Sequence, residues 1–208
     1  MFTLFGAHRS GSVAIEMALA LCGAEYRWVA ASSWEEGAGQ EELRRLNPLL
    51  QVPTLVTADG AVLTESAAIL IHLGLEFPHA RLLSRDPLEC AQQLRALTYI
   101  TANCYASIGV IDYPERWLPD ADEDQRKALV VGATRNLHSQ WETFSDVFGS
   151  AVVWHPEAPG AVEILACVVS RWSGAREHLK TVRPAFHAAL EVLDRHPLIL
   201  AVSQRRGW

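Results

Sequence analysis

The stretch from residue 47 to residue 73, NPLLQVPTLVTADGAVLTESAAILIHL, limits the fold more than any other part of the chain. Asn47-Pro48 ends a helix, and Asp59-Gly60 predicts a tight turn with β-type residues on both sides. An apolar helix follows from residue 67 to residue 73. The first strand is expected over residues 52–56, and Pro53 stands at its head, where a residue without a backbone N–H is unusual. The stretch therefore predicts an antiparallel hairpin with a helix packed on it.

The residues before this stretch predict a β-α-β unit. Residues 2–5 read as a buried strand, and apolar residues recur at helical spacing over 13–22 until Gly23 stops the helix. Residues 26–30 alternate as a second strand, and a short helix is expected over 40–46. Joined to the hairpin unit, this order predicts an α/β fold of the thioredoxin-like type, a mixed sheet covered by helices.

The pattern is helical almost throughout from residue 88 onward. We expect a thioredoxin-like domain over residues 1–76, a linker with two prolines over 77–87, and an all-α domain over 88–208. Its helices are predicted over residues 88–111, 123–148, 160–172, 184–194 and 197–205. The run VEILACVV is too apolar for a surface helix and predicts the centre of the bundle.

Charge and cysteine usage exclude several classes of function. The net charge is −6 and no Lys/Arg run occurs, which argues against nucleic acid as a partner. No apolar run reaches about 18 residues, so no membrane span is expected, and the first residues do not read as a secretory signal. The four cysteines are far apart, so neither a metal site nor a CxxC dithiol is expected, and each reads as a small buried apolar residue. We therefore expect a cytoplasmic protein.

In this order, the segments resemble the glutathione transferase superfamily over nearly the whole chain. The likeness is strongest over residues 47–73, moderate over 2–29, and weak over the helical part. It implies a homodimer that uses glutathione as a co-substrate, with a hydrophobic electrophile bound between the two domains and no metal.

The resemblance assigns glutathione to the opening stretch. It implies a cis peptide bond at Val52-Pro53, with the Val52 backbone free to bind an extended peptide. It implies that Ser66 binds the γ-glutamyl carboxylate at a helix N-terminus and that Glu65 pairs with its ammonium, while Gln51 contacts the ligand more loosely. From the residues alone, Pro53 could instead start an edge strand, and Glu65-Ser66 could be an ordinary helix cap.

The same resemblance places thiolate stabilisation in the turn before the first helix. Family members use Tyr, Ser or Cys there, and residues 6–12 offer only Ser10 and Ser12 as hydroxyl donors. Ser10 is our first choice, although either serine could simply cap the helix. Arg9 could place positive charge near the ligand or remain solvated.

The remaining candidates surround this centre. Trp34 lies in a loop where relatives hold the glycyl carboxylate, and Gln40 is a substitute because no basic residue occurs between Arg27 and Arg44. Three aromatic residues are expected either to line the second-substrate pocket or to lie in the bundle core: Tyr105, Tyr113 and Trp117. Where relatives have a Ser/Thr-x-x-Asp box, this chain has Gly160 and Glu163, which retain half of a capping box.

Two classes of function remain open. The first is an enzyme, a glutathione transferase or a glutathione-dependent isomerase. The second is a member of the fold that binds glutathione or a hydrophobic ligand without catalysis. Disulfide reduction is disfavoured because no cysteine occurs within residues 6–12.

Overall fold

A four-stranded mixed sheet forms the amino-terminal part of the computed structural model, which describes residues 1–32, 37–149 and 154–208. The strands are β1 (Phe2–Gly6), β2 (Tyr26–Ala30), β3 (Thr54–Val56) and β4 (Val62–Leu63). Their order is β2-β1-β3-β4, with β1 and β2 parallel and the other pairs antiparallel. This confirms the predicted combination of a β-α-β unit and a hairpin.

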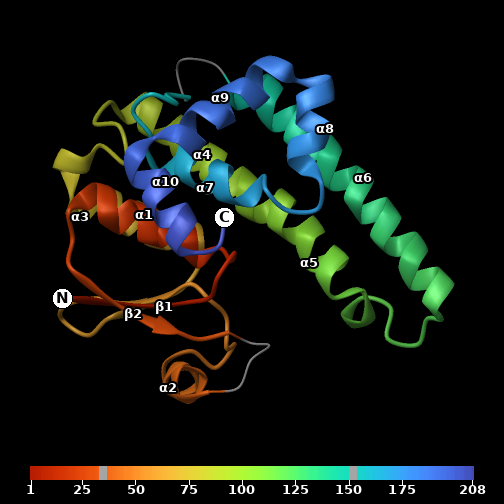
Figure 1. Cartoon of the computed structure of the whole chain (residues 1–208), viewed down its shortest axis with the longest axis horizontal. Helices are drawn as coiled ribbons and strands as arrows, with labels where there is room; N and C mark the ends of the chain where they lie inside the picture. Colours follow the sequence, from red (N-terminus) through yellow and green to blue (C-terminus); the bar gives the residue numbers. More distant parts are fainter. Residues whose placement is uncertain (33–36, 150–153) are drawn as a thin grey trace.

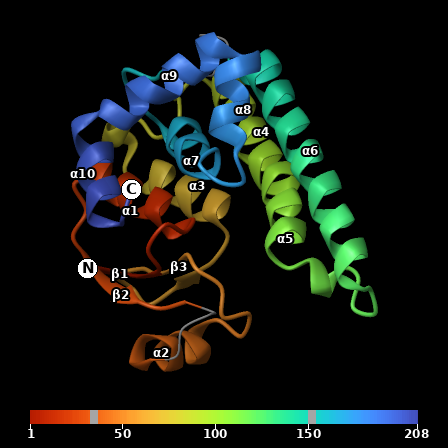
Figure 2. The same ribbon diagram turned by 45° about the vertical axis from the view of Figure 1, so that its right-hand side comes forward.

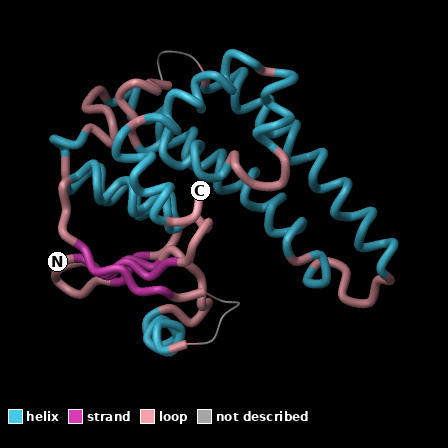
Figure 3. The backbone as a smooth tube through the Cα atoms, viewed as in Figure 1, coloured by secondary structure: helices cyan, strands magenta, loops and turns pink. Residues whose placement is uncertain are grey.

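Helices cover both faces of the sheet (Figures 1 and 3). They are α1 (Ser12–Cys22), α2 (Ala38–Leu46) and α3 (Ser66–Glu76). Helices α1 and α3 lie on the face toward the rest of the protein, whereas α2 lies alone on the opposite face. Most of α1 is buried because the sheet covers one side of it and later helices cover the other, which explains its nearly uniform apolar sequence.

The rest of the chain is helical, as predicted. Its longer helices are α4 (Pro87–Tyr99), α5 (Ala106–Asp112), α6 (Glu123–Phe148), α7 (Ala161–Val169), α8 (Ala175–Val182), α9 (Pro184–Arg195) and α10 (Pro197–Arg205). Every residue of α7 is buried, and Figure 2 shows this helix at the centre of the bundle. The fold is therefore a thioredoxin-like α/β part followed by an all-α bundle. The domain limits at residues 76 and 88 remain a prediction.

Three local differences from the sequence predictions have simple causes. Strand β3 begins at Thr54 rather than at residue 52, because Pro53 can donate no ladder hydrogen bond. Helix α8 was not predicted, because only Ala175 and Leu179 of its eight residues are buried and its pattern is too short to read. Between α4 and α5, the expected single helix passes through a π-helical segment, η2 (Ile100–Tyr105).

The half-kept capping box of α7 is confirmed. The carboxylate of Glu163 accepts the Gly160 N–H at 3.0 Å, and it also accepts the His155 N–H at 2.6 Å. Burial raises the pKa of this carboxyl, which these backbone donors partly oppose. Among the described residues, no helix is both long and apolar enough to cross a bilayer.

Candidate functional site

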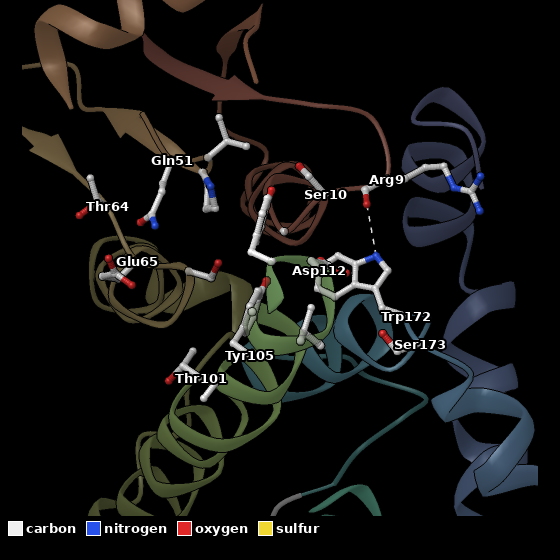
Figure 4. Close-up of a pocket in the computed structure, with 18 of the residues that line it drawn as sticks. Arg9, Ser10, Gln51, Thr64, Glu65, Thr101, Tyr105, Asp112, Trp172 and Ser173 are labelled. Carbon is white, nitrogen blue, oxygen red and sulfur yellow. Dashed lines mark hydrogen bonds between the residues drawn. The ribbon is translucent and has the colours of Figure 1, made fainter. Parts of the chain in front are cut away.

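A cavity of ≈ 920 Å³ separates the edge of the sheet from the helical bundle. One wall comes from the turn before α1, the loop before β3 and the start of α3, whereas the other comes from η2, α5 and the loop after α7. The lining residues are Arg9, Ser10, Gly11, Gln51, Val52, Pro53, Thr64, Glu65, Ser66, Thr101, Tyr105, Ala106, Ile108, Gly109, Asp112, Tyr113, Arg116, Trp117, Trp172 and Ser173. Figure 4 shows labelled side chains from both walls around one space.

The loop before β3 is held in place by Asn47. Its side-chain amide donates to the Gln51 carbonyl at 3.1 Å and to the Thr54 hydroxyl at 3.0 Å. The Val52-Pro53 bond is cis, as expected. Among the described residues, neither the N–H nor the C=O of Val52 has a hydrogen-bond partner, so both are available to a ligand in the cavity.

Helix α3 begins at the cavity. Glu65 takes the N-cap position with φ 64°, a left-handed conformation that costs a non-glycine residue free energy and is frequent at ligand sites. Ser66 is the first residue of the helix and is buried with its side chain beside the cavity. The free N–H groups and partial positive charge of a helix start favour an anion at this point.

The turn before α1 is closed by its own hydroxyl groups. The Ser10 hydroxyl lies 2.9 Å from the Ala7 carbonyl and 2.7 Å from the Ser12 hydroxyl. Ser12 in turn accepts the Ala7 N–H at 3.2 Å and lies 3.3 Å from the Ala7 carbonyl. Both hydroxyl protons are therefore used inside the turn. Of the two serines, Ser10 lines the cavity and Ser12 lies fully buried beneath it.

The Tyr105 hydroxyl is in the opposite situation. It is buried at the end of η2, and it has no hydrogen-bond partner within the described residues. It lies so close to Gly11 that a β-carbon at that position would collide with it. Burial, together with the charge of Glu65, raises the pKa of Tyr105 to about 12, although the nearby Ser66 hydroxyl acts in the other direction. Tyr105, which lines the cavity, therefore stays protonated, and its buried hydroxyl is a donor that no described residue uses.

The other predicted site residues divide into two groups. Tyr113, Trp117 and Arg9 line the cavity, and Figure 4 shows the Arg9 guanidinium pointing away toward α10. Gln40 is buried among the residues of α2, where its amide donates to the Ser32 carbonyl at 3.1 Å, and it does not line the cavity. Trp34 lies outside the described residues.

Several lining residues were not predicted. Trp172 and Ser173 follow the central helix, and their place at the cavity depends on how α7 packs rather than on any local motif. Asp112 ends α5, and burial raises the pKa of its carboxyl. Gly109 leaves open space on the cavity side of α5. The helical wall is therefore partly polar, which the apolar sequence pattern did not indicate.

The cysteines take no part in this site. Cys22, Cys104 and Cys167 are buried, as expected, whereas Cys90 is half-buried. Burial raises the pKa of Cys104 to about 12 and those of Cys22 and Cys167 to about 11, so these thiols stay protonated. In the part of the chain that the structure describes, no group of three or more His, Cys, Asp or Glu side chains is placed to hold a metal ion.

Comparisons with known proteins agree with this geometry. A family model described as "Glutathione S-transferase, N-terminal domain" matches residues 12–76. The uncharacterized GST-like protein YncG of Escherichia coli is 37% identical over 99% of this chain and 98% of its own length. The maleylacetoacetate isomerase of Pseudomonas aeruginosa is 27% identical over 89% of this chain and 94% of its own. Among solved structures, a Sulfitobacter glutathione transferase homolog with bound glutathione matches with a TM-score of 0.80, at 19% identity over 99% of this chain and 98% of its own.

Proposed function

Because this chain belongs to the glutathione S-transferase superfamily, we propose that it is a glutathione transferase acting on a hydrophobic electrophile. The observation that carries the proposal is the meeting of Val52, Glu65 and Ser66 with the unused Tyr105 hydroxyl in one cavity. A peptide-binding edge beside a free donor is what activation of a peptide thiol requires.

In this proposal, the amino-terminal wall binds the tripeptide. The free N–H and C=O of Val52 pair with the cysteinyl backbone in the manner of an added strand, and Gln51 adds a looser contact. Ser66 and the start of α3 take the γ-glutamyl carboxylate, and Glu65 takes the ammonium. The Sulfitobacter glutathione transferase homolog has the same fold, and its structure contains bound glutathione. This supports glutathione as the ligand of the present chain.

Thiolate stabilisation falls first to Tyr105 and second to Ser10. In the part of the chain that the structure describes, the Tyr105 hydroxyl has no hydrogen-bond partner, and burial raises its pKa to about 12, so it keeps its proton through the physiological range. Ser10 must give up its bond to the Ala7 carbonyl, which costs about 1 kcal/mol, before it can donate to sulfur. Ser12 would not contact the sulfur. Its hydroxyl can donate to the Ala7 carbonyl and so replace the bond that Ser10 gives up.

The second substrate would lie against the helical wall. Tyr113 and Trp117 supply aromatic surface, and the open space beside Gly109 admits a bulky group. Asp112 and Arg116 add charge at the same wall, so the electrophile carries polar substituents on a hydrophobic body.

Glutathione-dependent isomerisation is the second candidate. The likeness to the Pseudomonas aeruginosa maleylacetoacetate isomerase over most of both chains favours it. The two reactions use the same thiolate but differ in outcome, because an isomerase releases glutathione unchanged and a transferase consumes it.

The third candidate is a protein of this family that binds glutathione without catalysis. It is supported by Ser10 and Ser12, whose hydroxyl groups are bonded within their own turn. Calorimetry with glutathione, followed by conjugation of a chlorinated nitroaromatic and isomerisation of maleylacetoacetate, separates the three. Binding with glutathione consumption supports the transferase, binding with isomer formation alone supports the isomerase, and binding with neither supports the third candidate. Absence of binding would overturn all of them.

We also propose that the protein is a cytoplasmic homodimer. Leu75 and Leu88 are large apolar side chains that are 71% and 72% exposed, and a second subunit would cover such surface. Light scattering coupled to size exclusion tests the dimer, and a monomeric mass at micromolar concentration would contradict it.

A further inference from the structure

The backbone of Arg9 is bonded on both sides to the helical part of the protein. Its N–H donates to the Arg206 carbonyl at 3.2 Å, and its C=O accepts the Trp172 indole N–H at 3.3 Å, the bond drawn in Figure 4. Arg9 has φ 54°, a left-handed conformation that a non-glycine residue adopts only where its surroundings hold it there. These two bonds are therefore what holds the residue immediately before Ser10.

The Arg206 carbonyl is itself fixed to the sheet part. The Arg206 side chain makes two bonds to the fully buried Glu16 carboxylate of α1, at 2.5 Å and 2.9 Å. Its guanidinium also lies 3.5 Å from the centre of the Trp28 ring. Glu16 belongs to α1, the helix that follows the Ser10 turn. Because Arg206 is bonded to this helix, its carbonyl is held in one position relative to Arg9.

Trp172 connects the same turn to the other donor of the cavity. Its ring packs edge-on against Tyr105, with 5.6 Å between ring centres, while its N–H holds Arg9. Trp172 also contacts Trp208, with 6.5 Å between ring centres, and the Arg171 guanidinium lies 4.8 Å from the Trp208 ring. One indole thus contacts both Tyr105 and Arg9, the residue immediately before Ser10.

We propose that Trp172, Arg206 and Trp208 are positioning residues, which clamp the Arg9 backbone and so hold Ser10 and Tyr105 where they can receive a thiolate. The inference rests on the glutathione-binding function proposed above. The tripeptide-binding groups Val52, Glu65 and Ser66 lie on separate elements, so the clamp acts on the sulfur and leaves the binding of the peptide largely intact.

The test is the variant Trp172→Phe, which keeps a ring beside Tyr105 and removes the bond to Arg9. The matched control is Trp141→Phe, because the Trp141 indole N–H is buried in the helical core, has no partner among the described residues and lies outside the cavity. Two readouts are used: hydrogen exchange of the backbone amides of residues 6–12, and a pH titration of bound glutathione followed by the ultraviolet absorbance of its thiolate.

In Trp172→Phe we expect amide exchange over residues 6–12 to rise about tenfold, as loss of one hydrogen bond would give. The pKa of the bound thiol should rise by about one unit, while the Kd for glutathione stays within about threefold. Trp141→Phe should lower the Tm and change none of these. Unchanged exchange and titration in Trp172→Phe, or equal changes in both variants, would overturn the proposal.

The clamp can be tested even if the wild-type protein binds no glutathione or if Trp172→Phe does not fold. If the wild-type protein binds no glutathione, the proposed function fails, and the exchange of residues 6–12 alone decides whether the clamp exists. If Trp172→Phe does not fold, Trp208→Ala replaces it, because this change removes the support of Trp172 and leaves the Arg206–Glu16 pair in place. It should raise exchange over the same residues by a smaller factor, and unchanged exchange would contradict the clamp.

Discussion

The two walls of the cavity differ in how their hydroxyl groups are used. On the amino-terminal wall, Ser10 and Ser12 bond to each other and to Ala7, so their polarity closes a turn. On the helical wall, the Tyr105 hydroxyl is buried without a partner among the described residues. A buried unpaired donor is costly unless a ligand meets it, whereas a satisfied one mainly maintains shape. The hydroxyl groups of the amino-terminal wall therefore maintain the shape of a turn, whereas the Tyr105 hydroxyl of the helical wall is available to a ligand.

The largest effect is expected from Tyr105→Phe. Removal of one preorganised donor should lower the turnover number by about 100- to 1000-fold, measured by conjugation of a chlorinated nitroaromatic. The Tm should stay the same or rise slightly, because no described residue loses a hydrogen bond when this hydroxyl is removed.

Tyr99→Phe is the control for this change. Tyr99 lies on the preceding helix, outside the cavity, and its hydroxyl donates to the Gln140 carbonyl at 3.1 Å. Its loss should lower stability by about 1 kcal/mol and leave turnover intact. Full activity in Tyr105→Phe would show that the unpaired hydroxyl has no role in the chemistry.

Ser66→Ala tests the binding function of the amino-terminal wall. We expect the Kd for glutathione to rise about 10- to 100-fold, as for the loss of a hydrogen bond to a charged group, with titration calorimetry as the measurement. Ser107→Ala is the matched control, since this buried hydroxyl bonds Gln140 at 2.9 Å away from the cavity. Equal affinity in wild type and Ser66→Ala would remove the start of α3 from the ligand site.

Ser10→Ala should have a smaller effect on turnover than Tyr105→Phe. Because its hydroxyl already bonds the Ala7 carbonyl, we expect less than a tenfold fall in turnover and a loss of about 1 kcal/mol in the free energy of unfolding. Steady-state kinetics and chemical denaturation measure the two quantities. A fall in turnover of 100-fold or more would show that Ser10, rather than Tyr105, is the main hydrogen-bond donor to the thiolate.

Gln40→Ala should leave glutathione affinity within about twofold of the wild-type value. The Gln40 amide bonds the Ser32 carbonyl and is buried away from the cavity, so its loss affects local stability alone. Calorimetry checks the affinity. A tenfold loss would mean that α2 contributes to the ligand site after all.

Sequence reasoning succeeded where local rules decide the structure. Strand Tyr26–Ala30 and helix Glu123–Phe148 were predicted at their observed limits, and Glu163 caps α7 as expected. Gln51, Val52, Pro53, Glu65 and Ser66 all reach the cavity, because a short hairpin and one helix start bring them together. Their roles toward glutathione stay proposals.

The features of the site that could not be predicted from the sequence are determined by tertiary packing. The direction of the Ser10 hydroxyl depends on the Ala7 carbonyl, and the free state of Tyr105 depends on the π-helical segment that carries it. Trp172 reaches Arg9 from a position 163 residues away in sequence. Such contacts leave no periodic or motif-like signal, so the helical wall could not be read in advance.

A pH titration of bound glutathione tests the central claim most directly. A hydroxyl that donates to sulfur favours the thiolate, so the pKa of the bound thiol should lie at least about one unit below its ordinary value of about 8.5. Tyr105 remains protonated throughout, since its pKa is raised to about 12, and activity should therefore fall only as the pH drops through the thiol pKa. Tyr105→Phe should return the bound thiol toward its ordinary value. A bound thiol in the wild-type protein that titrates like free glutathione would contradict the account.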